Sequence, residues 1–101
     1  MAYNGVMRAR KIAYAVCKVF SLSLSQLISA PRSKDIDLAR GIYCYCCWKD
    51  GIHPTLSRQV IQRSRANMIN IGKRYRDAYE IGDRCVIAAV NKVIEMLEDK
   101  K

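Results

Sequence analysis

Apolar residues recur along this chain at steps of three and four, the spacing that gathers them on one face of an α-helix. The first such stripe predicts a helix from about Asn4 to Phe20. Its inward side is made by Val6, Ala9, Ala13, Val16 and Phe20. A shorter helix is expected from about Leu24 to Ser29, because Ser23 can cap its first turn and Pro31 ends it.

The most apolar stretch of the chain predicts a third helix, from about Lys34 to Trp48. Beyond Ile42 this helix is apolar on nearly every side, a pattern typical of a helix in the centre of a bundle. Asp35 and Asp37 near its start suit the positive end of the helix dipole. The inward residues are expected to be Ile36, Ala39, Ile42, Tyr43 and Cys46.

Two consecutive helices are predicted after the loop at residues 51–54, at about 55–62 and about 65–79. Thr55 or Ser57 can cap the first helix, and the polar turn between the two supplies a cap for the second in Ser64. The inward residues of the pair are expected to be Val60, Ile61, Met68, Ile71 and Tyr75.

A last helix is predicted from Asp83, its cap, to about Glu98. Its inward stripe is Val86, Ile87, Val90, Ile94 and Leu97. In the preceding helix Gly72 costs about 1 kcal/mol relative to alanine, which we interpret as a sign of close helix packing there. Strand signals are scarce, so we expect one all-α domain over residues 1–101, a compact bundle of about six helices containing a helix-turn-helix.

Charge adds to this picture because it is sorted along the chain, whose formal net charge is +9. Residues 1–18 and 55–76 hold basic side chains and no acid, whereas residues 77–101 hold more acids than bases. Sorted positive charge suits a polyanionic partner, since each neutralised phosphate releases counterions. We therefore expect contact with nucleic acid, and the plainer alternative is a basic surface that only keeps the protein soluble.

The helices at about 55–62 and 65–79 have the order of a helix-turn-helix, whose second helix enters the major groove of DNA. Many ordinary helix pairs share this order, so the prediction of DNA binding also needs side chains that can bind DNA. Arginine binds guanine or phosphate with its forked guanidinium, and asparagine pairs with adenine edges. The predicted duplex-DNA contacts of this unit are Arg58, Arg63, Arg65, Asn67, Asn70, Lys73 and Arg74.

Four strings occur in order along the chain: Val16–Ser29, the basic Arg32-Ser33-Lys34, Ile36–Tyr45 and Thr55-Leu56. Together with the helix after Asp83, they resemble the C-terminal DNA-binding domain of the bacterial replication initiator DnaA, a Trp-repressor-like helix-turn-helix fold. The likeness covers about residues 6–98. It implies that the basic loop near 30–34 touches the minor groove or the DNA backbone, and Arg32 and Lys34 occupy the matching positions.

The chain departs from that family at the start of the second helix of the pair. The family carries a Gly-Arg-Asp-His-Ser/Thr-Thr string there, and the matching stretch is Gln62–Asn67, in which only Arg63 keeps its identity. The resemblance therefore implies the fold without implying recognition of the family's origin sequence. The initiator's ATPase domain is also missing, so we expect a stand-alone module related to replication initiation rather than an initiator.

The cysteines offer a second chemistry. Cys44 and Cys47 have the spacing of a zinc motif, and His53 lies nearby. Both cysteines fall on the predicted core helix, and cysteine is among the most buried residue types, so we interpret them as core residues and predict no cofactor. The odd number of cysteines and the lack of a signal peptide favour a reducing cytoplasm, with a nucleoid-associated location.

Other functions remain as alternatives. A basic adaptor or inhibitor would bind an acidic protein partner, and an exposed apolar patch on residues 42–48 would favour it. Tyr43, Tyr45 and Trp48 are candidates for stacking on single-stranded bases, although an apolar helix favours core packing for them. A metal-dependent sensor is a third alternative. No enzyme is expected, because the single His53 has no companion carboxylate and is interpreted as a turn or capping residue. No apolar run approaches the ~20 residues of a membrane span.

Overall fold

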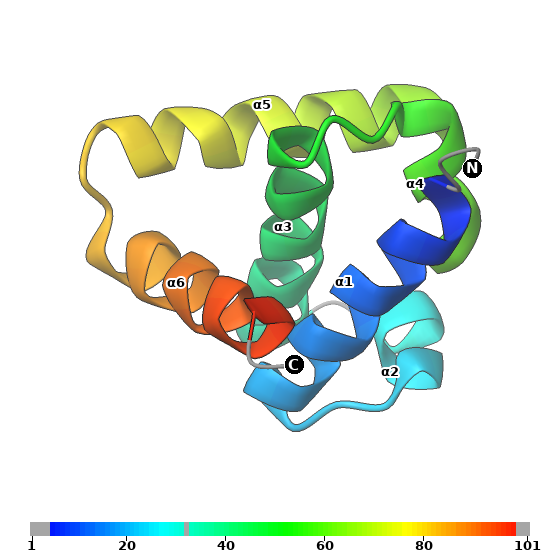
Figure 1. Cartoon of the computed structure of the whole chain (residues 1–101), viewed down its shortest axis with the longest axis horizontal. Helices are drawn as coiled ribbons and strands as arrows, with labels where there is room; N and C mark the ends of the chain where they lie inside the picture. Colours follow the sequence, from blue (N-terminus) through cyan, green and yellow to red (C-terminus); the bar gives the residue numbers. More distant parts are fainter. Residues whose placement is uncertain (1–4, 32, 99–101) are drawn as a thin grey trace.

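The structure is a computed structural model that describes residues 5–31 and 33–98. Within these residues it contains six α-helices and no strand (Figure 1), which confirms the predicted all-helical class. The helices are α1 (Gly5–Phe20), α2 (Leu24–Ser29), α3 (Lys34–Lys49), α4 (Pro54–Ile61), α5 (Arg65–Glu80) and α6 (Arg84–Glu98). Asn4, the expected start of the first helix, lies outside the described residues.

Helix α3 is the centre of the bundle. Figure 1 shows α5 crossing α3 at the top of the view, with α1 and α6 on the other side of α3, and α5 contacts α3 along its length, from Asp37 to Trp48. Every residue from Arg40 to Cys47 is buried, as expected for a helix that is apolar on nearly all sides. Trp48 departs from that expectation because 50% of its surface is exposed at the end of the helix.

One hydrophobic core joins residues from all six helices. Most of the expected inward side chains face this core, but Ile87 is half-buried and does not belong to it. Those at its edge are half-buried, namely Val6, Phe20, Ile71, Tyr75, Ile94 and Leu97. The described part of the chain has no helix with the length and apolar character that a bilayer crossing requires.

Local capping fixes where most helices begin. The Ser23 hydroxyl accepts from the Gln26 amide at 3.1 Å, and the Gln26 side chain accepts from the Ser23 amide at 2.8 Å, which completes a capping box. The Ser64 hydroxyl caps α5 by accepting from the Asn67 amide at 3.1 Å. The Asp83 carboxylate accepts from the Val86 amide at 3.2 Å at the start of α6. These three predicted caps are confirmed.

The predicted cap of α4 is wrong. His53 caps this helix, its Nδ1 accepting from the Thr55 amide at 3.1 Å, and Pro54 is the first helical residue. Proline suits that position because its φ is preset and its missing N–H would have no helical partner. Ser57 is instead buried inside the helix, where its carbonyl accepts from the Tyr43 hydroxyl at 2.6 Å. The interpretation of His53 as a capping residue is confirmed.

The close helix contact expected at Gly72 occurs at another glycine. A Cβ built on Gly72 would meet no atom within 4 Å, whereas a Cβ on Gly41 would overlap the ring of Tyr75. The Tyr75 ring therefore lies directly on the backbone of α3, and its hydroxyl donates to the Asp37 carbonyl at 3.4 Å. Gly41 is the residue that lets α5 approach α3.

Alanine substitutions at the two glycines should act in opposite directions. Gly41→Ala should lower the free energy of unfolding by about 1–3 kcal/mol, since the Tyr75 ring and α5 must move to make room. Gly72→Ala should raise it by up to about 1 kcal/mol, because alanine favours the helix and meets no steric barrier. Urea unfolding followed by circular dichroism measures both, and equal effects at the two sites would contradict this packing.

Candidate nucleic-acid interface

Helices α4 and α5 are joined by a tight turn at residues 62–64. Gln62 ends α4 in the left-handed conformation, with φ 56° and ψ 50°, and its amide donates to the Arg58 carbonyl. The Arg63 amide donates to the same carbonyl at 3.2 Å, and the Arg58 side chain donates back to the Arg63 carbonyl at 3.4 Å. These bonds close the turn, and Ser64 then caps the first turn of α5.

The outward face of α5 carries five of the predicted DNA contacts. Met68 and Gly72 are buried on the side of the helix that faces the core. The predicted residues lie off that side and are all exposed: Arg65, Asn67, Asn70, Lys73 and Arg74. The first described acids on the helix are Asp77 and Glu80, so the basic and amide groups occupy its first turns.

The sequence predicts that Arg63 is a DNA contact, but in the structure its side chain turns toward α2. Its side chain is half-buried, and its Nη2 donates to the Ile28 carbonyl at 3.2 Å, at the end of α2. This contact joins residues that are far apart in the sequence. Arg63 therefore orients the start of α5 against α2, and a smaller part of its guanidinium faces solvent than a freely extended arginine would offer.

Arg40 meets the same end of α2 from the core side. It is only 5% exposed, its Nε donates to the Leu27 carbonyl at 2.8 Å, and its Nη2 donates to the Ala30 carbonyl at 3.0 Å. The last carbonyls of a helix have no helical partner, and a basic side chain also suits the negative end of the helix dipole. Sequence reasoning missed this role, although a lone arginine within an apolar helix was the available signal.

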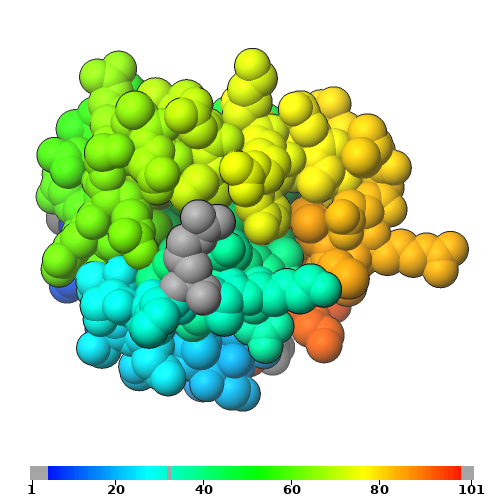
Figure 2. Space-filling model, turned by 180° about the vertical axis from the view of Figure 1, so that it is seen from behind, coloured from blue at the N-terminus to red at the C-terminus, as the bar shows by residue number. Residues whose placement is uncertain are grey.

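The start of α3, where Lys34 is the first residue, lies beside α5. The Arg63–Ile28 bond and the Tyr75–Asp37 bond tie α5 to the chain on either side of residues 30–34. Figure 2 shows the resulting face, with α5 across the top and the blue-green start of α3 directly below it. Lys34 in this segment is exposed, and Arg32 lies outside the described residues. On α4, Arg58 is exposed beside the turn.

The basic groups of this face have little internal compensation. Within residues 5–31 and 33–98, the one ion pair joins Arg8 to Asp50, on another part of the surface. Arg76 is the exception among the arginines of α5, because its guanidinium lies over the Trp48 ring at 4.4 Å from the centroid. The exposed cations of α5 are therefore available to an external anion.

The aromatic residues of α3 do not form an open stacking platform. Tyr43 and Tyr45 are buried, and Tyr45 stacks on Tyr79 with ring centroids 5.2 Å apart. Trp48 is exposed, but Arg76 lies over its ring. Since residues 42–47 are all buried, this helix also lacks the contiguous apolar patch that would favour an adaptor.

Cys44 and Cys47 are core residues, as the sequence interpretation favoured. Burial raises the pKa of the Cys44 thiol to about 12 and that of Cys47 well above its ordinary value, so both stay protonated near neutral pH. The metal-binding form of cysteine is the thiolate, which this environment disfavours. Cys44 instead contacts Met68, with 3.6 Å between the two sulfur atoms. Among the residues that the structure describes, no group of three histidine, cysteine or acidic side chains is placed to hold a metal ion.

Comparison of this chain with protein-family models, with curated proteins and with solved structures finds no match. The resemblance to the C-terminal domain of the replication initiator therefore remains a prediction.

Two matched substitutions test the arginines that hold the end of α2. Arg40→Met should lower the free energy of unfolding by about 2–4 kcal/mol, because it leaves the buried Leu27 carbonyl without a donor. Arg63→Met should cost about 1 kcal/mol, since its contact with the Ile28 carbonyl is half-exposed and solvent can replace the donor. Urea unfolding compares the two variants, and a smaller cost for Arg40→Met would refute the assignment.

Proposed function

We propose that this protein binds duplex DNA, with α5 in the major groove and the segment before α3 on the adjacent backbone. The observation that carries the proposal is that the five predicted contacts of α5 are all exposed, on the sides of the helix that do not face the core: Arg65, Asn67, Asn70, Lys73 and Arg74. Arginine and asparagine are the side chains that pair in bidentate fashion with guanine and adenine edges. The short turn after α4 matches a helix-turn-helix, in which the second helix is inserted.

The charge along α5 gives the direction of insertion. From Arg65 to Arg74 the helix is roughly 14 Å long, at a rise of about 1.5 Å per residue, which is close to the width of the major groove. Asp77 and Glu80 follow on the last turns and would repel phosphate. We therefore place the first turns of α5 against the bases and its last turns outside the groove.

Phosphate contacts flank these side chains in the proposed complex. Lys34 is the first residue of α3, whose first turn the Tyr75–Asp37 bond holds beside α5, and Arg58 lies beside the turn. Lysine binds phosphate as a point charge without reading sequence. These two residues would supply affinity and register, while Arg65 and Asn67 would supply discrimination between sequences.

Ile69 adds an apolar contact that sequence reasoning missed. Its side chain is 43% exposed, and it lies four residues after Arg65 and four before Lys73, on the same side of the helix. From sequence alone, an isoleucine is expected in the core. Here the neighbouring Met68 occupies the core-facing position, and Ile69 is left on the surface. An exposed apolar side chain on a major-groove helix suits the methyl group of thymine.

Selection of duplexes from a random pool, followed by fluorescence anisotropy on the full chain, tests the proposal. Arg65→Ala and Asn67→Ala should each reduce the preference for the selected duplex over a scrambled one by about 1–3 kcal/mol, because base contacts are lost. Lys34→Ala should weaken both duplexes by similar factors, because its contact is with phosphate.

Lys92→Ala is the matched control, because Lys92 is exposed on α6 and takes no part in the proposed interface. Affinity of the unmodified chain should fall steeply with salt as counterions are released. Absence of duplex binding, or affinity that stays constant as salt rises, would refute the proposal.

A further inference from the structure

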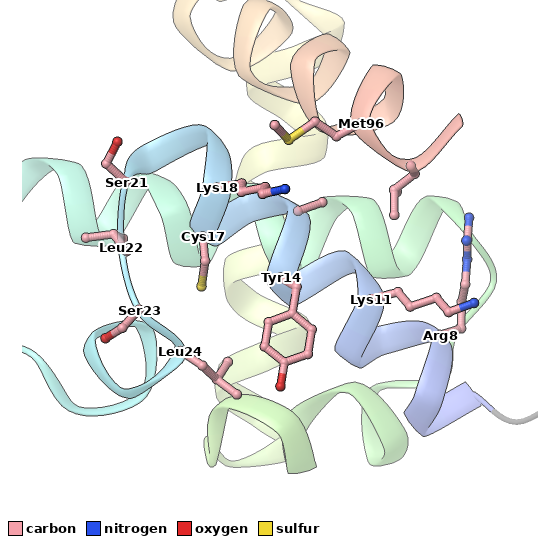
Figure 3. Close-up of a pocket in the computed structure, with 12 residues that line it drawn as sticks. Arg8, Lys11, Tyr14, Cys17, Lys18, Ser21, Leu22, Ser23, Leu24 and Met96 are labelled. Atoms are coloured by element: carbon pink, nitrogen blue, oxygen red, sulfur yellow. The ribbon is translucent and has the colours of Figure 1, made fainter. Parts of the chain in front are cut away.

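A second basic surface lies along the exposed side of α1. It shares no residue with the α4–α5 unit. It is a groove of about 1010 Å³ between α1, the turn that leads into α2, and the end of α6. In Figure 3, α1 crosses the groove with Lys11, Tyr14 and Lys18 on it. The side chain of Lys18 lies toward Met96 of α6. The ring of Tyr14 points the other way, toward Leu24 of α2.

The exposed side of α1 has an amphipathic pattern that the bundle leaves uncovered. Met7, Lys11, Tyr14 and Lys18 follow one another at steps of four, three and four residues, so they form one stripe along the helix. Met7 is 58% exposed and Tyr14 54% exposed, although both have large apolar side chains. Half-buried leucines and methionine border the stripe, namely Leu22, Leu24, Met96 and Leu97.

The charge of the groove is positive and largely uncompensated. Neither Lys11 nor Lys18 forms an ion pair in the part of the chain that the structure describes. No described residue that lines the groove is acidic. Arg8 differs from the lysines, because its guanidinium binds the Asp50 carboxylate, with 2.9 Å between Nε and Oδ2. The groove therefore offers apolar surface between two available lysines.

We propose that this groove docks an acidic amphipathic helix of a partner protein. The stripe from Met7 to Lys18 is roughly 16 Å long at about 1.5 Å per residue, the length of three helical turns. An amphipathic helix in a groove presents apolar anchors at the same three- and four-residue steps. Its leucines would contact Tyr14, Leu24 and Met96, and its glutamates would pair with the two lysines.

Charge argues against a second copy of this chain as the occupant. Two copies of α1 packed against each other would bring the lysines of both stripes together, and the net charge of +9 opposes self-association. Nucleic acid would use the lysines but would gain little from the apolar walls. An acidic helix uses both features of the groove, which is why the structure favours a protein partner.

A synthetic helical peptide tests the groove directly. Its heptads carry leucine at the two core positions and glutamate at the flanking positions, and a control peptide has lysine in place of each glutamate. The acidic peptide should bind the full chain and shift the amide resonances of α1 and of residues 21–24, and the basic peptide should not bind. Lys11→Glu with Lys18→Glu should weaken binding by about tenfold or more.

Arg84→Glu with Lys92→Glu makes the same change in net charge on exposed positions of α6 and should leave peptide binding unchanged. Tyr14→Ala should also weaken the peptide without altering duplex affinity, which separates this inference from the proposed DNA interface. Peptide shifts on α5, equal losses in both charge-reversal variants, or self-association that the Lys11 and Lys18 reversal abolishes would each overturn the proposal.

Discussion

Two arginine side chains on the last carbonyls of α2 hold the arrangement on which the rest of the structure depends. Helix α2 is short, and its final carbonyls have no helical partners. Arg40 reaches them from the core helix, and Arg63 reaches them from the turn before α5. Three segments that are distant in the sequence therefore meet at one point, and the end of α2 is held beside the turn that leads into α5.

The packing of α5 on α3 supplies the second constraint on this face. The Tyr75 ring lies on Gly41, and its hydroxyl donates to the Asp37 carbonyl. With the Arg63 contact, this gives α5 two fixed points along its length. A helix held at both points presents a constant side to solvent, which is the condition for side chains on successive turns to act as one surface.

Local signals in the sequence were sufficient to locate the starts of most helices. Ser23, Ser64 and Asp83 cap helices through hydrogen bonds to amides only three residues away, so their patterns are readable without a fold. His53 was recognised as a capping residue, but its helix was not placed correctly, because Pro54 begins that helix from inside the expected loop. Gly41 and Gly72 could not be distinguished, since the difference lies in a ring contributed by another helix.

The site was less accessible from the sequence than the fold. A basic stretch shows which residues carry charge, but it does not show that Arg63 turns toward α2 while Arg65 stays exposed. The buried role of Arg40 and the exposure of Ile69 are likewise set by contacts between helices. The sequence also led us to assign the excess of positive charge to one partner, whereas the structure shows exposed cations both on α5 and along the groove on α1.

The central claim is that α5 and the start of α3 bind DNA together, as one surface. Amide chemical shifts recorded while a selected duplex is titrated into the full chain test this claim most directly. The account predicts that Ser33 and Lys34 shift together with residues 65–74, at the same duplex concentration. Shifts confined to one of the two segments, or concentrated along α1, would contradict it.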